Sequence, residues 1–83
     1  MDDGSAVQAF SRGLAALRLL AENGPMTATG IAQALGVHQS SASRLLRSLQ
    51  REGYVRKPTF HAFSLDVGIL LLAGVAMEHF REV

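Results

Sequence analysis

The sequence predicts a small, mainly helical domain in which three helices are followed by a two-stranded β-ribbon and one further helix. Three observations predict this order. Apolar residues recur at steps of three and four in three consecutive segments, two short alternating runs follow, and an almost wholly apolar segment comes last. With 83 residues, 48% of them hydrophobic, the chain can form one small core but not two domains.

The first helix is expected over residues 5–23. Ser5 fits the N-cap, and Gly24 with Pro25 ends the helix because proline cannot extend it. Its apolar stripe consists of Val7, Phe10, Leu14, Leu17 and Ala21, and Leu19 and Leu20 widen that stripe.

Two shorter helices are expected over 28–35 and 39–52. Thr27 fits the N-cap of the first, and Gly36 ends it with the positive φ that a sharp turn needs. The inward faces should hold Ala28, Ile31, Ala32 and Leu35 in one helix and Ala42, Leu45, Leu46 and Leu49 in the other. Two helices joined by a short glycine-containing turn are typical of a helix-turn-helix.

The ribbon is expected from two alternating runs, 54–57 and 62–65, with a turn at 58–61 between them. A ribbon directly behind a helix-turn-helix makes the winged type. Residues 1–66 are therefore interpreted as a winged helix-turn-helix domain.

The last segment, 67–83, is interpreted as a linker or dimerisation helix. It is apolar almost all round, so a partner surface must cover much of it. Its apolar run between Asp66 and Glu78 is too short to span a bilayer, so no membrane partner is expected.

Charge and composition narrow the function. Net charge is +1, yet five of the eight basic residues lie between Arg44 and Lys57, where only Glu52 opposes them. The chain has no cysteine, its three histidines are scattered, and no nucleophile–base pair or glycine-rich phosphate loop is present. These features predict neither an enzyme nor a metal or cofactor site. The acidic N-terminus has no apolar signal segment, so a cytoplasmic protein is expected.

The second helix of a helix-turn-helix fits the major groove of DNA, so we expect residues 39–52 to enter it. Gln39 suits adenine and Arg44 suits guanine, whereas the serines and Arg47 suit phosphates. Arg56 and Lys57, with the turn at 58–62, are expected to reach either the DNA backbone or an adjacent minor groove. The predicted DNA-binding residues are Gln39, Ser40, Ser41, Ser43, Arg44, Arg47, Arg56 and Lys57.

Plainer interpretations stay open beside these. The arginines also suit a solvated helix face, and one serine is expected merely to cap its helix. Phe60 is expected to pack on the core rather than to be an exposed anchor of the wing. His61 is expected to be a solvated turn residue, with a phosphate contact as the less favoured alternative. As a whole, the chain also suits a protein-interaction module that uses its apolar terminal helix.

Several segments together resemble the N-terminal domain of the isocitrate lyase regulator (IclR) family of transcription factors. They are FSRGLAALRLL at 10–20, GPMT at 24–27, IAQALGV at 31–37, SSASRLLRSL at 40–49 and EGYV at 52–55. The resemblance implies a bacterial regulator with a winged helix-turn-helix that binds an operator as a dimer. We expect the dimer to form through helix 5–23 and helix 67–83, the two segments with surplus apolar surface, and its two-fold symmetry then requires a palindromic operator. It also implies a small-molecule effector bound by a C-terminal domain that these 83 residues do not include.

Three positions depart from the family pattern. His38 replaces the usual proline, Gln39 replaces a basic residue, and the wing tip, 59–62, lacks the usual Asp and Gly. We therefore expect the first turns of helix 39–52, from Gln39 to Arg47, to read a sequence of this protein's own. The wing is expected to contribute least to DNA binding.

Overall fold

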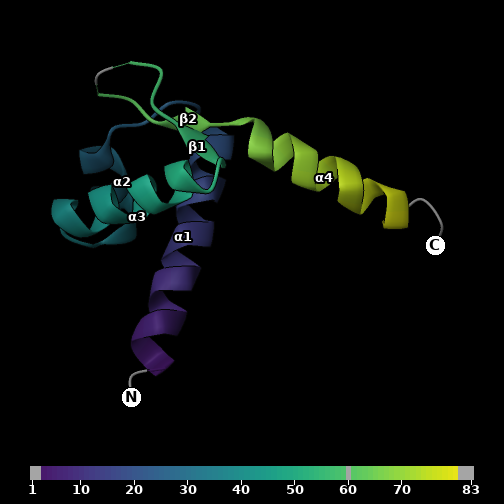
Figure 1. Ribbon diagram of the computed structural model, residues 1–83. Helices are drawn as coiled ribbons and strands as arrows, with labels where there is room; N and C mark the ends of the chain where they lie inside the picture. The colour runs from purple at the N-terminus through teal and green to yellow at the C-terminus, as the bar shows by residue number, and fades with distance from the viewer. Residues whose placement is uncertain (1–2, 60, 81–83) are drawn as a thin grey trace.

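The computed structural model describes residues 3–59 and 61–80. Its winged helix-turn-helix body gathers α2, α3 and the ribbon around the C-terminal half of α1, while α4 extends away from it (Figure 1). The elements are α1 (Asp3–Asn23), α2 (Ala28–Leu35), α3 (Gln39–Arg51), β1 (Val55–Arg56), β2 (Ser64–Leu65) and α4 (Val67–Phe80).

Helix α1 begins at Asp3, two residues before the predicted start. A capping residue has non-helical backbone, and Ser5 lies within the helix, so the prediction that Ser5 is the N-cap was wrong. The C-terminal half of α1 buries Ala16 and Leu20. The predicted stripe lies mostly outside the core, because the body packs only against this half and leaves Phe10 70% exposed.

The predicted turn between α2 and α3 is confirmed. Thr27 caps α2, its Oγ1 accepting a hydrogen bond from the Gly30 backbone N–H at 3.0 Å. Gly36 ends α2 with φ at +69°, and its neighbour Val37 donates to the Ala32 carbonyl at 3.0 Å. Val37 packs half-buried against the core and thereby fixes the angle between the two helices.

Helix α3 covers the predicted recognition segment except Glu52, which is its C-cap. His38 occupies the N-cap position without a side-chain capping bond. The expectation that a serine caps this helix was wrong, because the chain turns into the helix at His38 and the serines follow inside it.

The ribbon is shorter than predicted, with β1 and β2 pairing antiparallel in the register Val55↔Leu65 and Arg56↔Ser64. An unpredicted bridge lies beside it: Met26 and Phe63 exchange two backbone hydrogen bonds, at 3.0 and 2.8 Å. The bridge fastens the base of the wing to the segment between α1 and α2. The prediction for Phe60 lies outside the described residues.

One core holds the body together. Its buried side chains come from all three body helices, from β1 and from the residue just before β2: Ala16, Leu20, Ile31, Ala32, Ala42, Leu46, Val55 and Phe63. Ala28, Leu35, Leu45 and Leu49 pack half-buried around them, which confirms the predicted inward faces of α2 and α3.

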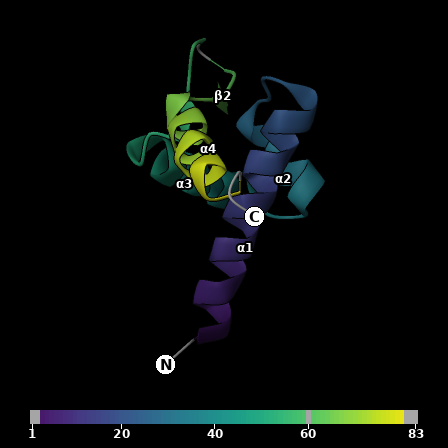
Figure 2. The ribbon, with the colours of Figure 1, turned by 90° about the vertical axis from the view of Figure 1, so that its right-hand side faces the viewer.

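Helix α4 leaves the body at the ribbon and runs outward, as two views at right angles show (Figures 1 and 2). It buries no residue, and Leu70 and Phe80 are each 70% exposed. The described part of the chain contains no helix with the length and apolarity needed to cross a bilayer.

Candidate nucleic-acid interface

The outward surface of α3 carries the predicted contact residues. Gln39, Ser40, Ser41, Arg44 and Arg47 are exposed, and Ser43 is half-buried. The opposite surface of α3 buries Ala42 and Leu46 in the core. Because polar and apolar residues alternate at helical spacing, the core holds α3 with its arginine-bearing side toward solvent.

A first hollow of about 510 Å³ lies between α3, the wing and the N-terminus of α2. From α3 it is lined by Gln39, Ser43, Arg47 and Gln50, which recur at steps of four, four and three and so share one side of the helix. Lys57 and His61 line it from the wing, and Thr27 and Thr29 from α2. We name this the wing-side hollow.

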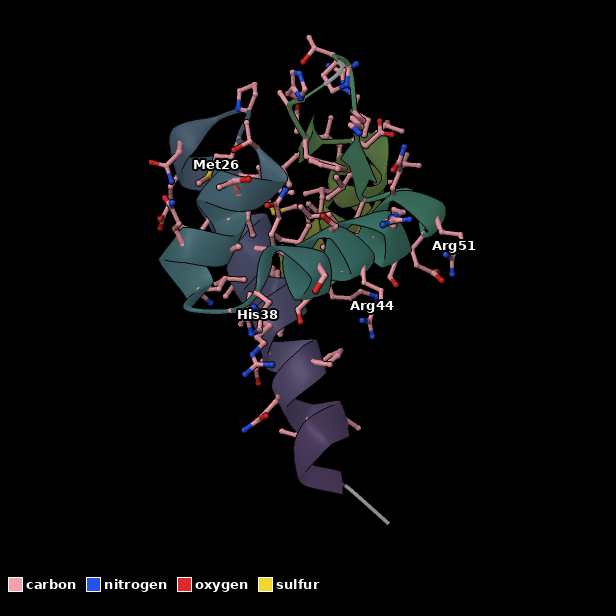
Figure 3. The ribbon with its side chains drawn as sticks, turned by 90° about the vertical axis from the view of Figure 1, so that its left-hand side faces the viewer. Met26, His38, Arg44 and Arg51 are labelled. Atoms are coloured by element: carbon pink, nitrogen blue, oxygen red, sulfur yellow. The ribbon has the colours of Figure 1, made fainter. Side chains whose placement is uncertain are left out.

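A second hollow lies on the other flank of α3, against α1. Ser41, Arg44 and Ser48 line it from α3, and Phe10 and Leu14 are among its residues from α1. Arg44 and Arg51 extend from the edge of α3 that faces away from the ribbon (Figure 3). The predicted residues thus divide between two flanks, with Gln39 and Arg47 on one and Arg44 on the other.

The wing presents its two basic residues differently. Val55 is buried and Arg56 exposed, as expected when successive side chains of a strand point to opposite faces. Lys57 is the next residue in the sequence. Its Nζ lies 5.2 Å from the centre of the Phe63 ring, which is a cation–π contact between two residues that line the wing-side hollow. Arg56 does not line that hollow. Of the two predicted basic residues of the wing, Lys57 alone therefore lies in the same hollow as Gln39 and Arg47.

Sequence reasoning left Gln50, Thr27 and Thr29 out of the predicted contact residues, and all three line the wing-side hollow. Gln50 carried a usable signal, since it continues the Ser43–Arg47 side of α3. Thr27 and Thr29 carried none beyond the helix cap, because their place beside α3 follows from the packing of α2.

The arrangement suits a nucleic acid chemically. Amide, hydroxyl and guanidinium groups project from one helix, and an α-helix of about 10–12 Å diameter fits a major groove of about 12 Å. A cationic wing and threonine hydroxyls on either side suit the flanking phosphates.

Comparison with known proteins shows which family this helix-turn-helix is similar to. Residues 9–58, more than half of the chain, match the family model described as the IclR helix-turn-helix domain. Over 52 residues the chain is 42% identical to the transcriptional repressor IclR of Escherichia coli and to the acetate operon repressor of Salmonella typhimurium. These 52 residues are 61% of this chain and 19% of each relative, so the chain spans about a fifth of the curated relatives it matches.

Solved structures show the same fold. An IclR family transcriptional regulator from Brucella abortus superposes with a TM-score of 0.75 at 35% identity, covering 93% of this chain and 30% of that one. A Zalpha domain from Carassius auratus PKZ, solved in complex with Z-DNA, has a TM-score of 0.65 at 25% identity over 70% of this chain and 97% of that one. The methyltransferase SibL also shares the fold, with a TM-score of 0.63 at 26% identity over 88% of this chain and 22% of that enzyme.

Proposed function

Because the chain belongs to the IclR helix-turn-helix family, we propose that it is the DNA-binding part of a cytoplasmic transcription regulator, with α3 entering the major groove. The observation that carries this proposal is the outward face of α3, where Gln39, Ser43 and Arg47 share one hollow with Lys57 of the wing. Curated relatives with the same helix-turn-helix are named as repressors.

The contacts divide by flank. In this proposal Gln39, which lines the wing-side hollow, both donates a hydrogen bond to an adenine and accepts one from it. Arg44 contacts a guanine from the flank of α3 nearest α1. Ser40, Ser41, Ser43 and Arg47 contact phosphates in this proposal. Lys57 adds a phosphate contact from the wing, and Arg56 a weaker one.

The regulator is proposed to act as a homodimer on a palindromic operator. Two surfaces of the described chain support this: the exposed apolar side of α1 at Val7, Phe10 and Leu14, and the uncovered helix α4. A two-fold dimer places two recognition helices in successive major grooves, with half-sites about 34 Å apart or a multiple of that distance.

Selection of bound sequences from a random duplex pool tests the proposal, and a palindromic consensus is the expected result. Titrations of that consensus should then compare Arg44→Ala and Arg47→Ala with Arg18→Ala, a matched change at an exposed α1 arginine that lines neither hollow. We expect Arg44→Ala to lose about 10-fold or more in specific affinity, the scale of one bidentate base contact, and little in non-specific affinity. An equal loss in both would make Arg44 a phosphate contact, and retention of wild-type affinity by both variants would refute the α3 interface.

A second candidate function is a protein-interaction module that uses α4. The exposure of α4 favours it, since Leu70, Leu71 and Val75 are each more than 60% exposed. The two functions separate in a low-salt titration with mixed duplex DNA. Absence of binding at every concentration would favour the interaction module.

A further inference from the structure

Helix α4 is joined to the body by a compact contact of four residues, Gly53, Tyr54, Asp66 and Gly68, which we name the α4 joint. The Gly68 backbone N–H donates to the Gly53 carbonyl at 3.1 Å, and the Asp66 N–H donates to the Tyr54 carbonyl at 2.9 Å. Asp66 also holds the first turn of α4, its Oδ1 accepting from the Val67 N–H at 2.7 Å.

The other side of the joint belongs to α3. The Gly53 N–H donates to the Gln50 carbonyl at 3.0 Å, and the Tyr54 N–H donates to the Leu49 carbonyl at 3.0 Å. Backbone hydrogen bonds therefore run without interruption from the last turn of α3 through Gly53 to the first turn of α4. The Gly53 carbonyl shares a planar peptide group with the Tyr54 N–H, so the bond from that N–H to the Leu49 carbonyl also restrains the Gly53 carbonyl.

The contact needs glycine at position 68. A methyl group there would overlap the Gly53 carbonyl oxygen and would lie 2.9 Å from its carbon and 3.0 Å from Cδ1 of Tyr54. Gly74 lies six residues further along the same helix. A methyl group added at Gly74 would meet no atom within 4 Å. Since α4 buries no residue against the body, few other contacts hold its direction.

We propose that Gly53 and Gly68 are positioning residues whose contact sets the direction of α4 relative to α3, and thereby the half-site spacing that a dimer accepts. This rests on the proposed function, in which α4 joins two copies. With 14 residues, α4 is about 20 Å long, so a tilt of about 10° moves its far end by about 3–4 Å. That displacement is about one base-pair step of DNA, ~3.4 Å.

The direction of α4 can be measured without DNA. Because the chain has no cysteine, Ala34→Cys on α2 and Glu78→Cys on α4 accept one spin label each. Both residues are exposed and line neither hollow. Pulsed-EPR distances, recorded with excess unlabelled protein so that only pairs within one chain contribute, then report the angle of α4.

We expect Gly68→Ala to shift the main distance by about 3 Å or more, as a tilt of α4 requires, and Gly74→Ala to reproduce the wild-type distribution. Asp66→Ala removes the bond to Val67 without adding atoms, so it should broaden the distribution even if Gly68→Ala fails to fold. A wild-type distribution in both Gly68→Ala and Asp66→Ala overturns the proposal.

The spacing is tested separately on palindromes whose half-sites are moved apart one base pair at a time. Wild type and Gly74→Ala should prefer one spacing, and Gly68→Ala should shift that preference by about one base pair while keeping its affinity for a single half-site. An unchanged preference in Gly68→Ala overturns the role in spacing. Failure of the wild-type chain to bind any palindrome would instead overturn the proposed function, and the EPR distances would still decide the role of the joint.

Discussion

At the scale of single residues, Arg56 and Lys57 are chemical equals in charge and neighbours in sequence, yet they lie in different surroundings. Lys57 contacts the Phe63 ring at the mouth of the wing-side hollow, and Arg56 lies outside that hollow. The alternation of an extended chain produces the difference, because it turns consecutive side chains to opposite faces.

This difference predicts unequal effects on DNA binding. Lys57→Ala should weaken binding to all sequences alike and reduce the slope of log K against log salt by about 1, the change expected for one lost phosphate contact. Arg56→Ala is the matched control, with a smaller effect on both quantities. Titrations at four or five salt concentrations measure the slopes, and a larger effect for Arg56→Ala would contradict the placement of Lys57 in the interface.

At the scale of elements, the helix-turn-helix depends on how α2 ends. Gly36 adopts φ +69°, a conformation that a residue with a Cβ adopts only with strain. A methyl group there would meet no atom within 4 Å, so the requirement for glycine comes from the backbone alone. The sharp turn from α2 to α3, and so the presentation of Gln39, depends on this conformation of Gly36 together with the packing of Val37.

Gly36→Ala should therefore lower the free energy of unfolding by about 1–2 kcal/mol, the cost of left-handed backbone in a residue with a side chain. Gly13→Ala is the control, because Gly13 lies within α1 with equally open surroundings. Alanine is favoured in a helix interior, so this change should raise stability by up to ~1 kcal/mol. Urea unfolding followed by circular dichroism measures both, and equal effects of the two substitutions would contradict a backbone origin.

At the scale of the whole molecule, the body has one core, and two helical segments outside that core are not covered. The N-terminal half of α1 and all of α4 extend beyond the core (Figures 1 and 2). Their apolar side chains face solvent in the single chain. Burial of such surface drives association, with each large side chain worth about 1.5–3 kcal/mol when fully covered.

Dimerisation through these helices predicts that Phe10→Glu and Leu71→Glu each raise the dimer dissociation constant at least about 10-fold, as the loss of one buried apolar side chain requires. Gln8→Glu adds the same charge to an exposed polar position of α1 and should leave the constant near its wild-type value. Sedimentation equilibrium over a range of concentrations measures it. A wild-type dissociation constant in both apolar variants would exclude α1 and α4 from the interface.

Local signals in the sequence predicted the helix-turn-helix well. Thr27 and Gly36 act through the backbone within a few residues of themselves, so composition and spacing suffice to place them. The buried side of α1 was not predictable in the same way. Phe10 and Ala16 differ in burial because of where the other elements pack, and that information is not local.

Two further features of the molecule could not be predicted from the sequence for the same reason. The hollow that joins Thr29 to Arg47 and Lys57 comes from three elements brought together only in the fold. The α4 joint depends on the approach of Gly68 to Gly53, and no local signal in the sequence indicates that these two glycines lie against each other.

The bridge between Met26 and Phe63 has a consequence for how the molecule folds. It closes a loop that contains the whole helix-turn-helix, and because closing a loop costs entropy, we expect the bridge to form together with α2 and α3 rather than before them. Pairing between distant residues requires loop closure first, and this makes the last step of assembly cooperative. The wing base and the recognition helix are thus expected to open and close as a single foldon, so that a partly folded chain would not present a finished DNA-binding surface.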